Sequence, residues 1–241
     1  MLRTALLLLS VVASRGGWAP NVHPVVISVS RARYSSVVRV LDRLNLTNIY
    51  KMTPQTWSER YVRQVTDTIV APEGPDSTRR HVSYALAYED LLGLLGLRTD
   101  EWWLVFEDDI EMDKSITLEA AQAAVARALE LARDDGVAHL GLCIPLACRP
   151  LEAVEGIHID RCTSYCSHAY AWHSSQAHRW RRFLMEHRAK HVFHAADWIL
   201  LDASRSVGGF VTVGRNLAGE PKDAYGIIHQ NLKWGSIMNA A

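Results

Sequence analysis

The feature that most constrains this chain is a run of apolar residues that ends directly in three acids. Trp102 to Phe106 (WWLVF) is a continuous apolar run that does not alternate with polar residues. Such a run predicts a strand buried on both faces of a sheet that helices cover. Glu107, Asp108 and Asp109 follow at once. We therefore expect an α/β fold with an acidic cluster at the end of one strand.

The rest of the chain alternates short apolar runs with segments of helical spacing, and residues 53–80 read as a loop with a helix near 57–66. The alternation predicts a mostly parallel central sheet flanked by helices, with ligands at the carboxyl ends of its strands. Asp113 or Ser115 is the expected N-cap of the Ala-rich helix. Strands are expected at 25–29, 49–52, 139–144, 169–172 and 210–213, helices at 35–44, 82–95, 115–133 and 176–186, and a short helical or extended piece at 198–201.

Charge and composition exclude several classes of protein. Lys plus Arg and Asp plus Glu both number 26, so the formal net charge is zero. A general nucleic-acid binder would need a basic excess, and a disordered chain would have fewer apolar residues. The sequence has no internal repeat and no long linker, so residues 20–241 are expected to form a single domain.

The first 19 residues have the pattern of a leader. One Arg precedes the apolar run Ala5 to Ala13, and small residues follow, which is typical of a secretory signal peptide. The run is too short to span a membrane, so no transmembrane anchor is expected. A buried strand and an organelle-targeting leader are the alternatives. Asn45-Leu46-Thr47 is an N-glycosylation acceptor triplet, which agrees with a secretory route.

All four cysteines fall within one 24-residue stretch of the chain. In an oxidising compartment they would form up to two disulfides, with three possible pairings. Free buried thiols remain an alternative, and so does a structural zinc site, although the spacing fits the usual zinc knuckles poorly. The residues are Cys143, Cys148, Cys162 and Cys166.

The three acids after the apolar strand suggest a cation site. Adjacent carboxylates repel one another, and Mg²⁺ or Mn²⁺ resolves that repulsion because these ions prefer oxygen ligands. In an extended chain, Glu107 and Asp109 point to one side and Asp108 to the other. One side would then hold a metal and the other a sugar or ribose hydroxyl. The alternative is a solvated turn before a helix N-terminus, where acids are favourable anyway.

Several segments, taken in order, resemble glycosyltransferase family 25, which includes lipooligosaccharide and collagen galactosyltransferase-like proteins, and in particular its algal and giant-virus relatives. The resemblance spans roughly residues 25–237, and Tyr84 stands where the family usually has His. The matching segments are Ser83 to Glu89, Trp103 to Glu111, Ser167 to Trp172, Asp197 to Leu200 and Gly226 to Asn231.

The resemblance implies a GT-A-like fold, a nucleotide-sugar donor and a bound Mn²⁺ or Mg²⁺. Asp197 is the candidate catalytic base, since its apolar neighbours would raise its pKa, and a helix N-cap is its alternative role. His168 is a second catalytic candidate or a buried core His. The metal candidates are Glu107, Asp109 and His229, and the donor-binding candidates are Ser30, Arg31, Arg33, Arg79, Ser83, Glu107 and Asp108.

The sequence therefore predicts a metal-dependent glycosyltransferase that acts on a glycan or protein hydroxyl and binds no nucleic acid. The expected location is the lumen of the secretory pathway or the exterior of the cell. A non-catalytic luminal relative that binds glycan or nucleotide is one alternative, and a metal-dependent phosphohydrolase is another. Trp102 and Trp103 are expected to be core residues rather than sugar-stacking platforms.

Overall fold

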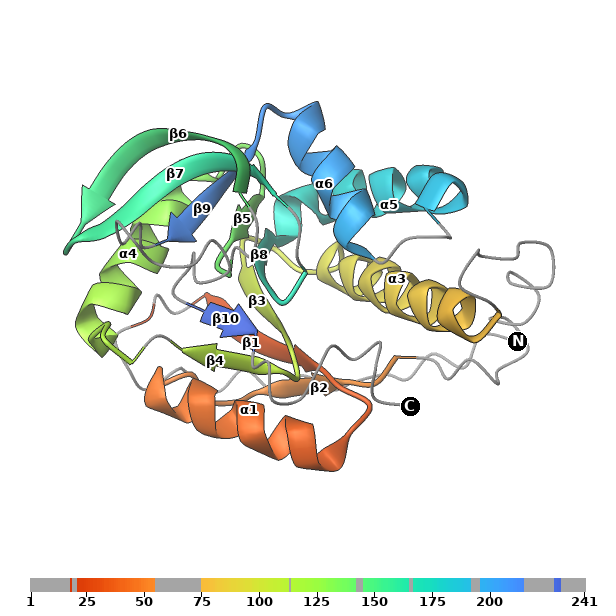
Figure 1. Ribbon diagram of the computed structural model, residues 1–241, viewed down its shortest axis with the longest axis horizontal. Coiled ribbons are helices and arrows are strands. Elements are labelled where there is room, and N and C mark those ends of the chain that lie inside the picture. The colour runs from red at the N-terminus through yellow and green to blue at the C-terminus, as the bar shows by residue number, and fades with distance from the viewer. Residues whose placement is uncertain are drawn as a thin grey trace.

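The computed structural model describes residue 18 and residues 21–54, 75–112, 114–141, 145–164, 167–191, 196–214 and 228–230. Figure 1 shows a sheet flanked by helices. The elements are β1 (Val22–Ile27), α1 (Arg31–Arg43), β2 (Tyr50–Met52), α3 (Pro75–Leu95), β3 (Trp102–Glu107), β4 (Ile110–Met112), α4 (Leu118–Leu131), β5 (Val137–His139), β6 (Pro145–Val154), β7 (Ile157–Ser164), β8 (Ala169–His173), α5 (Ala177–His191), α6 (Ala196–Ser206), β9 (Phe210–Gly214) and β10 (Ile228–Gln230).

The main sheet has eight strands in the order β2-β1-β3-β8-β5-β9-β7-β6, and β10 pairs with β4 in a second, two-stranded sheet. The pairings make six of the eight strands run in one direction, with β8 and β7 reversed. The α/β class and the predominant strand direction are therefore as predicted. The reversed strands β8 and β7 were not expected, and they make four of the seven pairings antiparallel.

Two apolar cores cover the two faces of the sheet. Alternate residues of β3 divide between them: Leu104 and Phe106 pack with α1 and α4, whereas Trp103 and Val105 pack with α3, α5 and α6. Both tryptophans of β3 are buried, which confirms that they belong to the core. Since successive side chains of a strand point to opposite faces, Glu107 at the end of β3 is directed toward the layer of α3, α5 and α6, and Asp108 toward the layer of α1 and α4.

Several predicted boundaries are wrong. Residues 75–80, expected as loop, form the first turns of α3, while the helix expected at 57–66 lies outside the described residues. Thr117, rather than Asp113 or Ser115, caps α4 by accepting a hydrogen bond from the N–H of Ala120. The hairpin of β6 and β7 was not predicted, because β6 is an exposed edge strand without apolar alternation.

The hairpin carries a disulfide between Cys148 and Cys162, which lie directly opposite each other in β6 and β7. This pair excludes the zinc alternative for these two residues, because disulfide sulfurs are not thiolate ligands. The two remaining cysteines of the sequence, at 143 and 166, lie outside the described residues.

Residue 18 is the described part of the predicted leader. Trp18 is 9% exposed, packs in the core beside α1 and donates its indole N–H to the carbonyl oxygen of Leu44 at 2.6 Å. Cleavage after residue 19 would remove this contact. Among the helices that the structure describes, none has the length and apolar character needed to cross a membrane.

Candidate active site

The acids lie at the topological switch point of the sheet. From β1 the chain passes outward to β2 and then returns to the other side of β1 to form β3. The carboxyl ends of β1 and β3 are level with each other, with Ile27 paired with Glu107. In open α/β sheets, ligands bind in the crevice outside the carboxyl ends of the strands at such a point. The topology therefore marks the same place that the acidic residues do.

Asp108 ties the end of β3 to the turn between β1 and α1. Its side chain is fully buried, its Oδ2 accepts a 2.6 Å hydrogen bond from Ser28 Oγ, and its Oδ1 lies 3.6 Å from Arg33 Nη1. Burial raises the pKa of Asp108, and the Ser28 hydrogen bond and the Arg33 charge offset part of that effect. Ser30 completes the turn as the N-cap of α1. These contacts fix the geometry of the turn beside the switch point.

Glu107 points to the other face, as the alternation predicts. It is 7% exposed, and Ser167 Oγ donates a short hydrogen bond to its Oε1. Burial raises the pKa of Glu107 well above its usual range, and the neighbouring charges of Asp109 and Asp197 raise it further. Hydrogen bonds from Ser167 and Tyr84 oppose this rise. Glu107 therefore belongs to a group of acids that disfavour one another's ionisation.

Asp197 joins the cluster from α6. It is the second residue of that helix, so it lies in the first turn rather than at the N-cap position. Burial raises the pKa of Asp197, and hydrogen bonds from Ser167 partly offset this. Its Oδ1 is buried and has no hydrogen-bond partner among the described residues. The fold thus brings Asp197 to the same face as Glu107, ninety positions away in the sequence, and gives its Oδ1 no donor from the residues that the structure describes.

Three tyrosines line the cluster. Tyr88 donates its hydroxyl to the carbonyl oxygen of Ser167 at 2.8 Å, and the ring of Tyr84 packs edge-on against that of Tyr88. Burial and the nearby charge of Glu107 raise the pKa values of Tyr84, Tyr88 and Tyr170 well above the usual range, and the charge of Asp197 adds to this rise for Tyr88 and Tyr170. These hydroxyl groups are therefore neutral at pH 7. They offer the carboxylates polar contact without cancelling their charge.

His168 lies at the edge of the cluster, immediately before β8. Its carbonyl oxygen accepts the N–H of Glu107 at 2.9 Å, and its ring is 6.3 Å from that of His139. The ring packs so closely over Gly141 that a Cβ at that position would lie 2.5 Å from His168 Nε2. Burial, followed by the proximity of His168, lowers the pKa of His139 well below its usual value. His168 is thus a buried residue held beside the acids.

The remaining sequence candidates occupy different settings. Arg31 is exposed at the start of α1, and Ser83 is buried on α3 next to Tyr84. The side chains of Arg79 and His229 lie outside the described residues. The backbone of His229 belongs to β10, opposite Glu111 of β4. Because β4 begins one residue after Asp109, the β10 segment runs beside the acidic turn.

The acids at the end of β3 supply two of the three predicted metal ligands. Within the part of the chain that the structure describes, no three His, Cys, Asp or Glu side chains form a group that could hold a metal ion. Glu107 and Asp109 are the two described members of the predicted set of ligands. The charge of Asp109 raises the pKa of Glu107, and a divalent cation would relieve this repulsion. These two carboxylates therefore fit a cation, and the third predicted ligand falls among the undescribed side chains.

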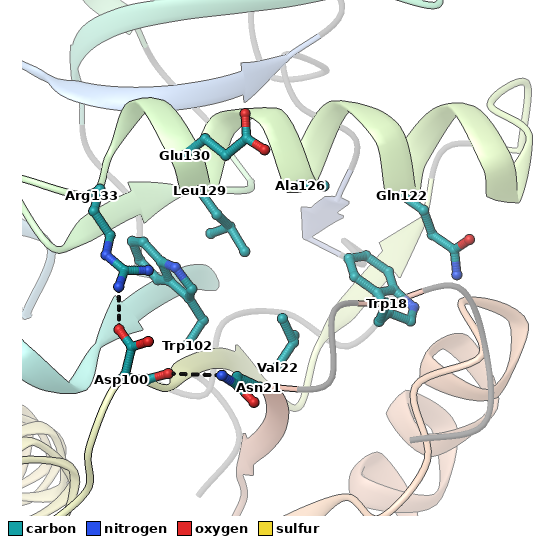
Figure 2. Close-up of a pocket in the computed structure, with 10 residues that line it drawn as sticks. All are labelled: Trp18, Asn21, Val22, Asp100, Trp102, Gln122, Ala126, Leu129, Glu130 and Arg133. Carbon is teal, nitrogen blue, oxygen red and sulfur yellow. Dashed lines mark hydrogen bonds and ion pairs between the residues drawn. The ribbon is translucent and has the colours of Figure 1, made fainter. Parts of the chain in front are cut away.

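A cleft of about 230 Å³ lies at the other end of the sheet (Figure 2). It includes Trp102, at the start of β3, about 17 Å along the strand from Glu107 at 3.3 Å per residue. An ion pair between Arg133 and Asp100 borders it. The cleft is thus separate from the acidic cluster. Its lining residues are Trp18, Asn21, Val22, Asp100, Trp102, Gln122, Ala126, Leu129, Glu130 and Arg133.

The sequence reasoning missed the polar residues that support the acids. Ser28, Tyr88 and Ser167 each contribute a hydroxyl group to the site. Ser28 directly follows β1, and Ser167 lies two residues before β8. Polar residues at the ends of buried strands were the available signal, but nothing in the sequence says which acid each would meet.

Comparisons with known proteins give no family assignment. No model of a known family matches the sequence, and no curated protein gives a significant match. Among solved structures, CTP:phosphocholine cytidylyltransferase from Streptococcus pneumoniae is 8% identical, with a TM-score of 0.40 and coverage of 87% of this chain and 93% of that one. 4-Diphosphocytidyl-2C-methyl-D-erythritol synthase is 12% identical, with a TM-score of 0.37 and coverage of 85% and 91%.

A third structure, mannose-1-phosphate geranyltransferase from Thermus thermophilus, is 12% identical, with a TM-score of 0.31 and coverage of 76% of this chain and 68% of that one. All three TM-scores are below 0.5, so the activities of these proteins carry no argument for this chain.

Proposed function

We propose that this protein is a metal-dependent glycosyltransferase that moves a sugar from a nucleotide-sugar donor to a glycan or protein hydroxyl group. One observation carries the proposal: Glu107 is buried at the switch point, and Asp109 and Asp197 lie close enough to add to the rise that burial causes in its pKa. Clustered carboxyl groups that disfavour one another's ionisation are typical of a site that binds a cation. The resemblance of the ordered sequence segments to glycosyltransferase family 25 supports the same reaction.

We assign the donor to the crevice between β1 and β3. The turn after β1 is held by Ser28 and Asp108, and α1 begins directly behind it. Arg33 offsets the charge of Asp108 and leaves the turn rigid. A rigid turn at a helix N-terminus offers backbone N–H groups to an anionic group such as a diphosphate. Ser30 and the exposed Arg31 lie at this helix start and are proposed to contact the donor. Arg79 and Ser83 of α3 are proposed to contact the donor from the opposite helical layer.

Glu107 and Asp109 are the proposed cation ligands, with His229 as the third. Mn²⁺ or Mg²⁺ bound there would neutralise the diphosphate leaving group. Before any cation binds, burial and the neighbouring acids favour the protonated state of Glu107, so binding would release a proton. Ser167 orients Glu107 through its hydroxyl and so fixes one side of the proposed cation site.

Asp197 is the proposed catalytic base. It must be ionised to accept the proton of the acceptor hydroxyl, and its raised pKa strengthens it for that task. Hydrogen bonds from Ser167 stabilise the ionised form, and Oδ1, which lacks a described donor, is the proposed proton acceptor. His168, buried beside the cluster, is proposed to line the acceptor side.

We place this activity in the lumen of the secretory pathway or outside the cell. The disulfide between Cys148 and Cys162 supports this location, since such bonds persist in oxidising compartments. The hydroxyl acceptor is proposed to be a glycan or a protein that passes through the same compartment.

The proposal is tested with purified protein and a panel of nucleotide-sugars, by measuring sugar transfer and donor hydrolysis with and without Mn²⁺. We expect Mn²⁺-dependent turnover that Asp197→Asn reduces at least 100-fold, while nucleotide binding is retained. Asp202→Asn, five positions later on α6 and close to Arg205, is the matched control and should stay active.

Three outcomes would favour other conclusions. Nucleotide binding without turnover on any donor would favour a non-catalytic relative. Release of phosphate from simple phosphate esters would favour a phosphohydrolase. Absence of both nucleotide binding and metal-dependent hydrolysis would refute the transferase.

A further inference from the structure

The helix α1 ends in a Schellman turn that fixes the residues after it. Leu46 donates its N–H to the carbonyl oxygen of Leu41 at 2.9 Å, and Asn45 donates to that of Asp42 at 3.0 Å. These are the two bonds of the motif, with Asn45 at the left-handed position (φ 54°). Leu46 is 3% exposed and lies in the same apolar core as fully buried Leu41. The turn is therefore anchored by both its backbone and its apolar contact.

The turn presents two side chains to solvent and buries the one between them. Asn45 and Thr47 are exposed, whereas Leu46 is buried. Asn45-Leu46-Thr47 is the single Asn-x-Ser/Thr triplet among the 241 residues. The Schellman motif explains an Asn at position 45, because Asn tolerates a positive φ, but it gives no reason for a Thr two residues later. The acceptor triplet accounts for both residues.

We propose that Asn45 is an N-glycosylation site. The side-chain Nδ2 of Asn45 forms a bond to the anomeric carbon of an oligosaccharide, and the bond from that carbon to a lipid diphosphate breaks. The amide loses one proton, and the lipid diphosphate leaves with the bonding electrons. The co-reactant is thus a lipid-diphosphate-linked oligosaccharide, and an oligosaccharyltransferase of the secretory pathway catalyses the step.

Two independent features agree with this modification. The disulfide between Cys148 and Cys162 indicates an oxidising compartment, which is where N-glycosylation takes place. The helix α1 starts beside the acidic cluster and runs for 13 residues, about 20 Å, before the turn at Asn45. A glycan on Asn45 would leave the protein at the C-terminal end of α1, away from the candidate active site, and would not block that site.

The test is expression of the full chain in a eukaryotic secretory host, followed by digestion with an amidase that removes N-linked glycans. We expect one step in electrophoretic mobility on digestion of the wild type. The step should be absent from Asn45→Gly and from Thr47→Ala and present in Thr47→Ser, which keeps the acceptor triplet. Asn45→Gly also keeps the turn, since Gly adopts a positive φ without strain. Its unfolding temperature should therefore stay close to that of the unglycosylated wild type.

A second arm replaces residues 1–17 with an established secretory leader and retains Trp18. A digestible glycan in either arm that Asn45→Gly abolishes supports the proposal. An unmodified chain in both arms, recovered folded from the medium, overturns it. Neither result depends on sugar transfer by the protein, because Asn45 lies outside the candidate active site.

Discussion

The hydrogen bond between Ser28 and Asp108 provides a quantitative test of the switch-point geometry. Ser28→Ala removes the 2.6 Å donor of a fully buried carboxylate. A hydrogen bond to a charged group contributes about 1.5–3 kcal/mol, so we expect the free energy of unfolding to fall by about 2 kcal/mol. Arg33 should not replace this hydrogen bond, because its guanidinium approaches the other oxygen of the carboxylate, with Nη1 3.6 Å from Oδ1. For a chain of this size the unfolding temperature should drop by about 4–8 °C.

The assay is urea and thermal unfolding followed by circular dichroism at pH 7. Ser35→Ala is the matched control, because its hydroxyl donates to the carbonyl oxygen of Arg31 at an exposed position and should contribute less than about 0.5 kcal/mol. In an Asp108→Asn background the effect of Ser28→Ala should shrink, since the partner is then uncharged. If Ser28→Ala and Ser35→Ala destabilise the protein equally, Asp108 is not held as described.

Three further perturbations test other parts of the fold. Burial raises the pKa of Glu107. The stability of the protein should therefore fall as the pH rises from the usual Glu pKa of about 4.3 to the raised pKa of Glu107 in the folded state. Glu107→Gln should unfold at a higher temperature than the wild type at pH 8, and equal pH profiles of the two proteins would contradict this. Gly141→Ala should lower the free energy of unfolding by about 1–3 kcal/mol, because the added Cβ would lie 2.5 Å from His168 Nε2. Gly93→Ala is the control: its Cβ would meet the flexible side chain of Arg181 at 3.2 Å, so it should be neutral or stabilising in denaturant titrations. Replacing both Cys148 and Cys162 with Ser should cost about 3 kcal/mol, and reductant should then lower the melting temperature less than it does in the wild type.

The parts of the fold that could be predicted are those whose burial leaves a local pattern. The strand β3 is buried throughout, and its apolar run marked it correctly. The first turns of α3 contain Pro75, Asp76 and Ser77 and lack an apolar stripe, so they read as loop although they are helical. The strand β6 is exposed and contains two prolines, and its pairing with β7 is set by the hairpin rather than by apolar alternation.

The candidate site was predictable to the same extent. Period-two alternation correctly separated Glu107 from Asp108, because that depends only on neighbouring residues. The partners of these acids could not be predicted, because Ser28 and Ser167 lie 80 and 60 positions away and meet them only through the order of strands in the sheet. Asp197 was predicted from its apolar neighbours, but its position in the first turn of α6 and its proximity to Glu107 emerge only in three dimensions.

The most direct test of the proposed metal-dependent transfer is a calorimetric titration of the purified protein with Mn²⁺ in the presence of a nucleoside diphosphate. The account predicts one saturable Mn²⁺ site that Asp109→Asn abolishes. Asp134→Asn, which changes an exposed acid in the turn after α4, should leave the titration unchanged. Equal Mn²⁺ binding by wild type and Asp109→Asn, or no binding by the wild type, would contradict the assignment of the acidic cluster as a cation site.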